Sequence, residues 1–198
     1  MYGESPVRHI DGHVRRADTT MHENMPDMYR ARSPNGPENR PLIPDPCSHI
    51  KEPVLVSACL LGIACRYDGK SKYSITFTED MNILPIPVCP EQLGGLPTPR
   101  APSDLIGGDG RDVLEGKARL LNSEGVDVTE NFIKGGRQTC NIARILNAKK
   151  AILKEDSPSC GVHMVKMSGK WTKGIGVAAA MLSNMGLKIV NEGEIESL

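Results

Sequence analysis

The chain has 198 residues, and its 24 Lys+Arg and 24 Asp+Glu give a formal net charge of zero. Its length fits one compact domain with an appendage. The charge balance argues against a polybasic nucleic-acid clamp or a broad binder of anionic membranes, because both need an excess of Lys and Arg. No run of about 18 apolar residues is present to span a bilayer, and the N-terminus lacks the apolar stretch of a secretory signal peptide. We therefore expect a soluble, cytoplasmic protein with no direct nucleic-acid partner and no membrane partner.

Residues 1–50 differ in composition from the rest of the chain. Seven of the 15 prolines lie there, and the apolar residues follow neither a helical nor a strand period. Such a segment buries too little apolar surface to offset the entropy of ordering it. The sequence predicts a disordered, Pro-rich leader over residues 1–50 and a folded domain over residues 51–198.

Short β-branched stretches alternate with helical patterns in the folded part. Strands are expected over residues 53–57, 83–89, 151–155 and 187–190. Residues 98–111, rich in Gly, Pro and Asp, are expected to form a loop, and residues 112–125 a strand or hairpin.

Two helices are expected, over residues 128–148 and 177–185. Thr129 is the candidate N-cap of the first, and Gly186 ends the second. The Gly135-Gly136 pair either weakens the first helix or lets a neighbour pack closely against it. Strands that alternate with helices predict the α/β class, as a single domain with a mostly parallel sheet flanked by helices and covered on both faces.

The cysteines suggest where the chemistry lies. In a reducing compartment a disulfide framework is not expected, which leaves metal binding, catalysis or burial for the six cysteines. Cys59, Cys89 and Cys160 each follow an expected strand, within turns that contain Gly or Pro. Because the carboxyl ends of parallel strands meet at one sheet edge, these thiols can converge there.

Three thiolates without an obvious fourth ligand favour a metal centre with an open coordination position, which is typical of a catalytic site. Zinc and an iron–sulfur cluster both stay open, since neither ferredoxin spacing nor a C-x2-C pair is present. The alternative is that the three residues are small buried hydrophobic side chains.

Five segments in chain order resemble one family. They are SACLLGIACRYDGKSK, VCPEQLGGLPTPR, DVTENFIKGG, AILKEDSPSCG and GIGVAAAMLSNMGLKI, and together they resemble the 2-thiouracil desulfidase family over about residues 53–194. The resemblance implies a [4Fe–4S] cluster held by Cys59, Cys89 and Cys160, with the fourth iron open. It also implies that the open iron captures the sulfur of a small thiolated pyrimidine, such as 2-thiouracil or 4-thiouridine monophosphate. Water then replaces the sulfur without net redox change, releasing sulfide and uracil or UMP.

The resemblance also implies roles for residues near the cysteines. Glu91 matches the family's acid/base position, and a serine of the SPSCG turn is the other active-site group, with Ser157 favoured over Ser159. Arg66, Tyr67 and Asp68 are candidate substrate contacts. The alternative is that Asp68-Gly69 forms a turn and Arg66 a structural ion pair. Arg100 is a candidate contact for a phosphate or ring oxygen.

Other reactive side chains have structural interpretations. Cys65 and Cys140 are expected to pack in the core, Cys47 to be a free thiol of the leader, and His163 to be a surface or hydrogen-bonded residue. Two further functions stay open from the sequence. One is dethiolation of thiolated tRNA with a separate RNA-binding partner, and the other is a non-catalytic module that senses metal or oxidant.

Overall fold

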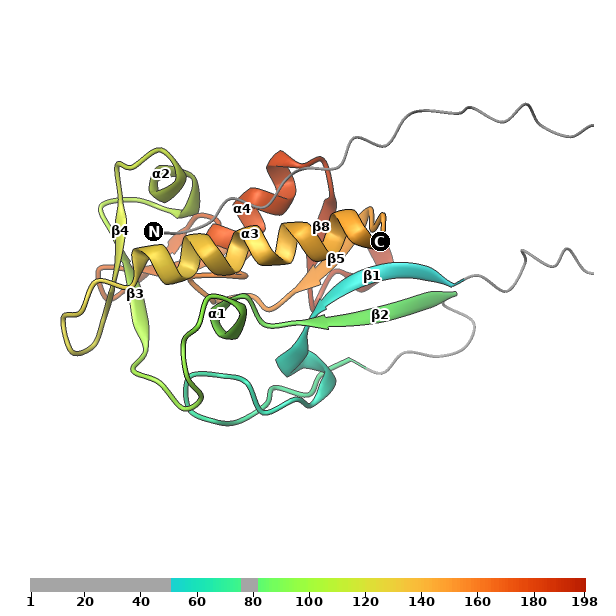
Figure 1. The fold of residues 1–198 in the computed structure, drawn as a ribbon, viewed down its shortest axis with the longest axis horizontal. Helices are drawn as coiled ribbons and strands as arrows, with labels where there is room; N and C mark the ends of the chain where they lie inside the picture. The colour runs from blue at the N-terminus through green and yellow to red at the C-terminus, as the bar shows by residue number, and fades with distance from the viewer. Residues whose placement is uncertain (1–50, 76–81) are drawn as a thin grey trace, which may run out of the picture. The chain divides into compact units, whose positions relative to one another are not determined.

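The computed structural model describes residues 51–75 and 82–198, all within one compact unit, Asp45–Leu198 (Figure 1). The expected disorder of residues 1–50 and the expected free thiol of Cys47 lie outside the described residues. Within the described ranges, no helix is long and apolar enough to cross a membrane.

The first sheet has four parallel strands in the order β2-β1-β5-β8. Their bounds are β1 Glu52–Ser57, β2 Ile83–Val88, β5 Lys150–Leu153 and β8 Lys188–Asn191. The central strands β1 and β5 are apolar and buried, as strands covered on both faces must be. β2 is an edge strand, and Pro85 and Pro87 are two residues apart, so both missing N–H groups face the open edge.

Helices cover one face of this sheet. α3 (Thr129–Ile145) and α4 (Val177–Asn184) bury Cys140, Ala143, Ala179 and Leu182 against Leu55, Ala151 and Leu153. The 3-10 turns η3 (Ala58–Leu61) and η5 (Ile195–Ser197), together with the loop that carries Cys65 and Ile75, cover the other face. The mixed α/β architecture with a mostly parallel sheet flanked by helices is confirmed.

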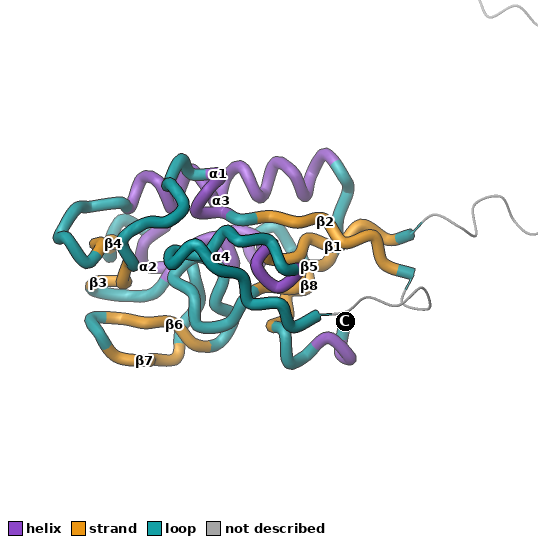
Figure 2. The backbone as a smooth tube through the Cα atoms, turned by 90° about the horizontal axis from the view of Figure 1, so that it is seen from below, coloured by secondary structure: helices purple, strands orange, loops and turns teal. Residues whose placement is uncertain are grey.

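A second sheet was not expected from the sequence. Its strands are β4 (Arg119–Asn122), β3 (Ser103–Ile106), β6 (Met164–Met167) and β7 (Lys170–Lys173), in that order. Only the β3–β6 pair is parallel, and the other two pairs are antiparallel. Figures 1 and 2 show the two sheets toward opposite ends of α3, which runs along both. Phe132 of α3 and Val177 of α4 pack with Leu105, Leu120 and Val165 of the second sheet.

Two expected segments differ from the structure. The loop expected over 98–111 contains β3. The strand or hairpin expected over 112–125 begins within the helix α2 (Gly110–Leu114), whereas β4 confirms a strand in the second half of that range. This helix starts because Asp109 and Asp112 form a reciprocal capping box, whose bonds are local and do not depend on the apolar period. Residues 168–169, with φ of 49° and 81°, form the turn of the β6–β7 hairpin. The sequence Ser-Gly at these positions is typical of such a turn, but the sequence analysis did not predict the hairpin.

The ends of the helices are set by hydrogen bonds. α4 ends as expected, with Gly186 in the left-handed region at φ 83°. The N-cap assigned to Thr129 is wrong, because Val128 occupies that position in α3. The Thr129 hydroxyl instead accepts a bond from the Leu120 amide at 2.9 Å, and this bond ties the helix to β4.

Candidate active site

A cavity of about 480 Å³ lies where β1, β2 and β5 end. β2 and β5 lie on opposite sides of β1, so the loops that follow these strands diverge and leave room between them. Cys59, Cys89 and Cys160 all line this cavity, which confirms their expected convergence at one sheet edge. A fourth cysteine, Cys65, lines it as well.

Cys59 follows β1 within the turn η3. Gly62, at φ 91°, ends this turn in a left-handed conformation that favours glycine, and its amide bonds back to the Cys59 carbonyl. The Lys72 amide donates to the same carbonyl at 2.8 Å, so the loop that contains Cys65 closes over Cys59. The Cys59 residue is consequently 7% exposed.

Cys89 and Glu91 are positioned by the short helix α1 (Pro90–Leu93). Cys89 is its N-cap, and Pro90 occupies the first turn, where a missing N–H is tolerated. A Cβ on Gly135 of α3 would meet the Pro90 carbonyl oxygen at 1.9 Å. Of the two interpretations of the Gly135-Gly136 pair, close packing is therefore confirmed. The contact between α3 and α1 holds in place the helix that carries Glu91 and is capped by Cys89.

Cys160 lies in the loop after β5. The Ser157 hydroxyl accepts bonds from the Ser159 and Cys160 amides at 3.2 and 3.1 Å, and Ser157 lines the cavity. Ser159 is fully buried, and its hydroxyl has no hydrogen-bond partner among the described residues. The Cys160 thiol is hydrogen-bonded to the buried Ser57 of β1.

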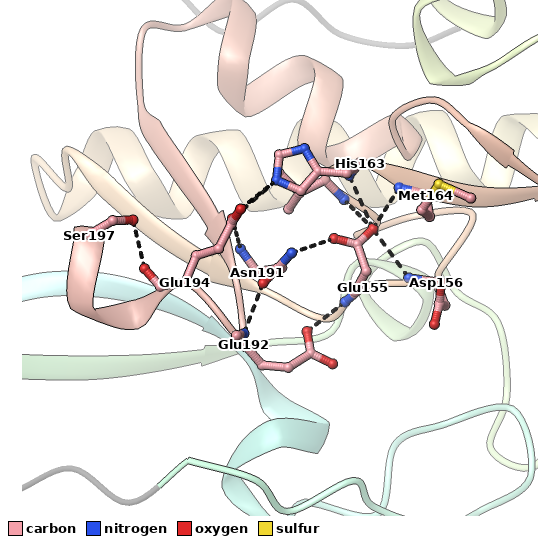
Figure 3. Close-up of polar contacts among 10 residues, drawn as sticks. Glu155, Asp156, His163, Met164, Asn191, Glu192, Glu194 and Ser197 are labelled. Atoms are coloured by element: carbon pink, nitrogen blue, oxygen red, sulfur yellow. Dashed lines mark hydrogen bonds and ion pairs between the residues drawn. The ribbon is translucent and has the colours of Figure 1, made fainter.

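Glu155 anchors the loop that carries Cys160 (Figure 3). Its Oε1 accepts the amides of Val162, His163 and Met164 at 3.1, 3.1 and 2.7 Å, and its Oε2 accepts Asn191 Nδ2 at 2.9 Å. Burial alone would raise the pKa of this carboxyl, but these donors outweigh it and lower the pKa below 4.5. One carboxylate at the beginning of the loop thus binds the backbone at the end of the loop.

The protein raises the pKa values of Cys65, Cys89 and Cys160, so these three thiols favour their protonated form. Burial raises the pKa of Cys160 to about 12, although the hydrogen bond to Ser57 opposes this. A hydrogen bond to Cys59 raises the pKa of Cys65 to about 11, and one to Cys65, together with burial, raises the pKa of Cys89. Thiolate ligands must be deprotonated, so metal loading of this site must release protons.

The Arg100 side chain is hydrogen-bonded to other residues of the protein. Its Nε donates to Glu91 Oε2 at 2.6 Å, and its NH1 donates to the Cys65 and Pro97 carbonyls, each at 3.1 Å. The Arg100 side chain is 6% exposed and that of Glu91 16%, and both residues line the cavity. Among the described residues Glu91 Oε1 has no hydrogen bond, so it is free to bind a water molecule. The expected contact of Arg100 with substrate stays a prediction.

The residues of the RYDG segment differ in their positions relative to the cavity. The Gly69 amide bonds to the Arg66 carbonyl at 3.0 Å, and Arg66 Nε lies 3.5 Å from Asp68 Oδ1, so the predicted turn and ion pair are confirmed. Arg66 and Tyr67 line the cavity, whereas Asp68 does not. Substrate binding by these residues stays a prediction.

The remaining side chains take structural places. Cys140 is buried in the core under α3, as expected. His163 is exposed, bonds to Glu194 at 2.9 Å and does not line the cavity. Sequence reasoning missed Ser57 and Glu155 and placed Cys65 only in the core. The available signal was position, because Ser57 directly follows the apolar run of β1 and Glu155 lies two residues after that of β5.

The cysteines of the cavity are arranged for a multi-iron cluster and not for a single metal ion. Within residues 51–75 and 82–198, no three His, Cys, Asp or Glu side chains are arranged to hold a metal ion. A multi-iron cluster differs from a single ion, because its thiolates bind different irons and surround a cavity instead of one point. A cavity lined by Cys59, Cys89 and Cys160 supplies soft donors of this kind and fits an iron–sulfur cluster.

Comparisons with known proteins agree with this chemistry. The family model described as 2-thiouracil desulfurase matches residues 54–194. The chain is 42% identical over 149 residues to "Uncharacterized protein YbbK" of Bacillus subtilis (strain 168), covering 73% of this chain and 99% of that protein. A solved structure of the [4Fe-4S]-dependent thiouracil desulfidase TudS is similar with a TM-score of 0.63 and 33% identity, covering 75% of this chain and 95% of that chain. The expected family is confirmed: the chain belongs to the 2-thiouracil desulfurase family.

Proposed function

We propose that this protein is an iron–sulfur enzyme that replaces the sulfur of a thiolated uracil with oxygen from water, releasing sulfide. Its family and its similarity to a [4Fe-4S]-dependent thiouracil desulfidase support an enzyme of this kind. The observation that carries the proposal is the meeting of Cys59, Cys89 and Cys160 with Glu91 in one cavity. The cavity of about 480 Å³ is in the range of small-molecule sites.

In this proposal Cys59, Cys89 and Cys160 hold a [4Fe–4S] cluster and leave one iron without a protein ligand. The bound cluster supplies a Lewis acid that polarises the C=S bond and accepts a soft sulfur atom. The three cysteines follow three neighbouring strands of one sheet, and the sheet therefore sets the spacing between them. Cys59 and Cys160 are 7% and 5% exposed, which limits contact of their sulfur atoms with bulk water.

Glu91 is the proposed proton carrier. Its Oε2 is held by Arg100 at 2.6 Å, which leaves Oε1 to accept a proton from the attacking water. As the water oxygen bonds to the ring carbon, the C–S bond breaks and sulfur leaves as sulfide. The proton returns to the products, so one water is consumed and no electrons are gained or lost.

Ser157 and the RYDG segment are proposed to hold the substrate. Ser157 lines the cavity next to Cys160 in sequence and can orient the ring or the water through its hydroxyl, with Ser159 as the alternative. Arg66 lies 5.7 Å from the centre of the Tyr67 ring, and both residues line the cavity. Tyr67, which is 44% exposed, offers an aromatic face for a pyrimidine.

Anaerobic reconstitution of the full chain with iron and sulfide tests the proposal. The loaded protein is expected to be brown and to release sulfide from 2-thiouracil, 4-thiouridine or 4-thiouridine monophosphate. Substrate-dependent sulfide release from a colourless zinc-loaded protein would contradict the cluster. A brown protein that releases no sulfide from these compounds would favour a sensing module, and activity on thiolated tRNA alone would favour the RNA alternative.

Serine substitutions test the assigned ligands. Cys59→Ser, Cys89→Ser and Cys160→Ser should each lose most bound iron, because a hydroxyl is a harder and poorer iron ligand than a thiolate. Cys140→Ser is the matched control, since Cys140 is also buried but does not line this cavity. Equal iron content in the control and the three variants would refute the assignment.

A further inference from the structure

Four thiols surround the cavity, and the proposed function uses only three of them. Cys65 is 2% exposed and lies in the loop between Gly62 and Gly69, after the turn that carries Cys59. Its side chain lines the same cavity as the three proposed ligands. Packing in the core explains its burial but does not explain its neighbours.

Those neighbours are other thiols. Cys65 packs in one cluster with Cys59 and Cys89. The Cys89 thiol also lies 3.7 Å from the Cys65 carbonyl oxygen. The buried Cys140 offers a contrast, because it packs under α3 and does not line this cavity. Cys65 is therefore distinguished by contact with two proposed cluster ligands.

We propose, as an extension of the proposed function, that Cys65 is a displaceable fourth ligand of the iron–sulfur cluster. Its thiolate binds the iron that Cys59, Cys89 and Cys160 leave open while no substrate is present. It gives up that position to the sulfur of the arriving thiolated uracil. Substrate sulfur can replace it because the two donors are chemically alike.

The main chain near Cys65 is suited to such an exchange. Arg100 NH1 holds the Cys65 carbonyl at 3.1 Å, so the backbone stays in place. Rotation about the Cα–Cβ bond then moves the sulfur toward or away from the cluster. The same arginine holds Glu91 at 2.6 Å, so the exchanging thiol and the proton carrier are fixed by one side chain.

The exchange balances without an oxidant or a reductant. On binding, the Cys65 S–H bond breaks, its proton goes to solvent, and the sulfur donates an electron pair to iron. When the substrate binds, the bond between Cys65 sulfur and iron breaks, the substrate sulfur donates a pair in its place, and Cys65 regains a proton. A persulfide on Cys65 would instead need a two-electron oxidant to capture the released sulfide, and none is proposed.

The test compares substrate-free proteins after anaerobic reconstitution: wild type, Cys65→Ala, Cys65→Ser and the control Cys140→Ala. Each is oxidised with ferricyanide, and loss of the fourth iron is followed by iron content and by the EPR signal of a three-iron cluster. Loss of second-shell partners already weakens metal binding about 10–100-fold, so Cys65→Ala should lose this iron at least about tenfold faster than wild type. Cys65→Ser keeps the side-chain volume and should also lose iron faster, which separates ligation from packing.

Equal rates of iron loss in wild type and both Cys65 variants would overturn this inference and leave the proposed function intact. A Cys65→Ala protein that folds, as judged by circular dichroism, but takes up no iron would also overturn it, because Cys65 would then be a permanent ligand. A wild-type protein that takes up no iron would overturn the proposed function and this inference together.

Discussion

Replacing Glu155 with glutamine tests how the loop that carries Cys160 is held. In the native protein one carboxylate accepts four backbone amides and the Asn191 side chain. Glutamine keeps one oxygen for the amides, but its NH2 group then faces the NH2 group of Asn191. The substitution therefore loses one hydrogen bond and weakens the four backbone hydrogen bonds by removing the charge.

The magnitude follows from these contacts. Hydrogen bonds to charged groups contribute about 1.5–3 kcal/mol each and neutral ones about 0.5–1.5 kcal/mol. Glu155 is only partly buried, so water replaces part of the loss, and we expect a destabilisation of about 2–3 kcal/mol. For a domain of this size about 1 kcal/mol lowers Tm by roughly 2–4 °C, so Tm should fall by about 5–10 °C.

The assay is thermal unfolding of the metal-free protein by calorimetry or circular dichroism, with Glu115→Gln as control. Glu115 is 58% exposed and, within residues 51–75 and 82–198, its carboxylate pairs only with Lys117, so Tm should not change. The pKa of Glu155 in the folded protein is below 4.5, so its contribution is present above that pH and is lost as the pH falls through the folded-state pKa. The difference from wild type should be constant near neutral pH and close below about pH 4.5. A Tm change as small as that of the control, or a difference that persists in acid, would refute the anchoring role.

Glu91→Gln should lower sulfide release about 10²–10⁴-fold with unchanged iron content; equal rates per cluster would remove Glu91 from the mechanism. Gly135→Ala should destabilise the protein by about 1–3 kcal/mol and lower activity, because its Cβ would meet the Pro90 carbonyl at 1.9 Å. An unchanged Gly135→Ala melt would disprove the close packing. The raised pKa values of Cys65 and Cys160, about 11 and about 12, contribute stability that is complete below pH 9 and is lost as pH rises through them. The Tm of the metal-free protein should accordingly fall above pH 9, and less so in Cys65→Ala; a fall of equal size in both would contradict the shift at Cys65.

The amino-acid sequence alone determined the parallel sheet and the residues at its carboxyl edge. Apolar β-branched runs predicted β1, β2, β5 and β8, because burial on both faces requires continuous apolar strands. Parallel strands place their carboxyl ends together, so Cys59, Cys89 and Cys160 could be assigned to one site before any contact was known. Motif resemblance added Glu91 and Ser157.

Only the tertiary structure decided which side chains touch one another. The strands of the second sheet are four residues each, too short for a clear period, and pairing across long sequence separations defines them. Arg100 is 9 residues from Glu91 and 35 from Cys65, and no periodic pattern links it to both. From the sequence Cys65 is predicted only as a core residue, because the apolar pattern predicts burial and nothing more. Its contact with two other thiols depends on how η3 and α1 pack around the sheet edge, which only the tertiary structure shows.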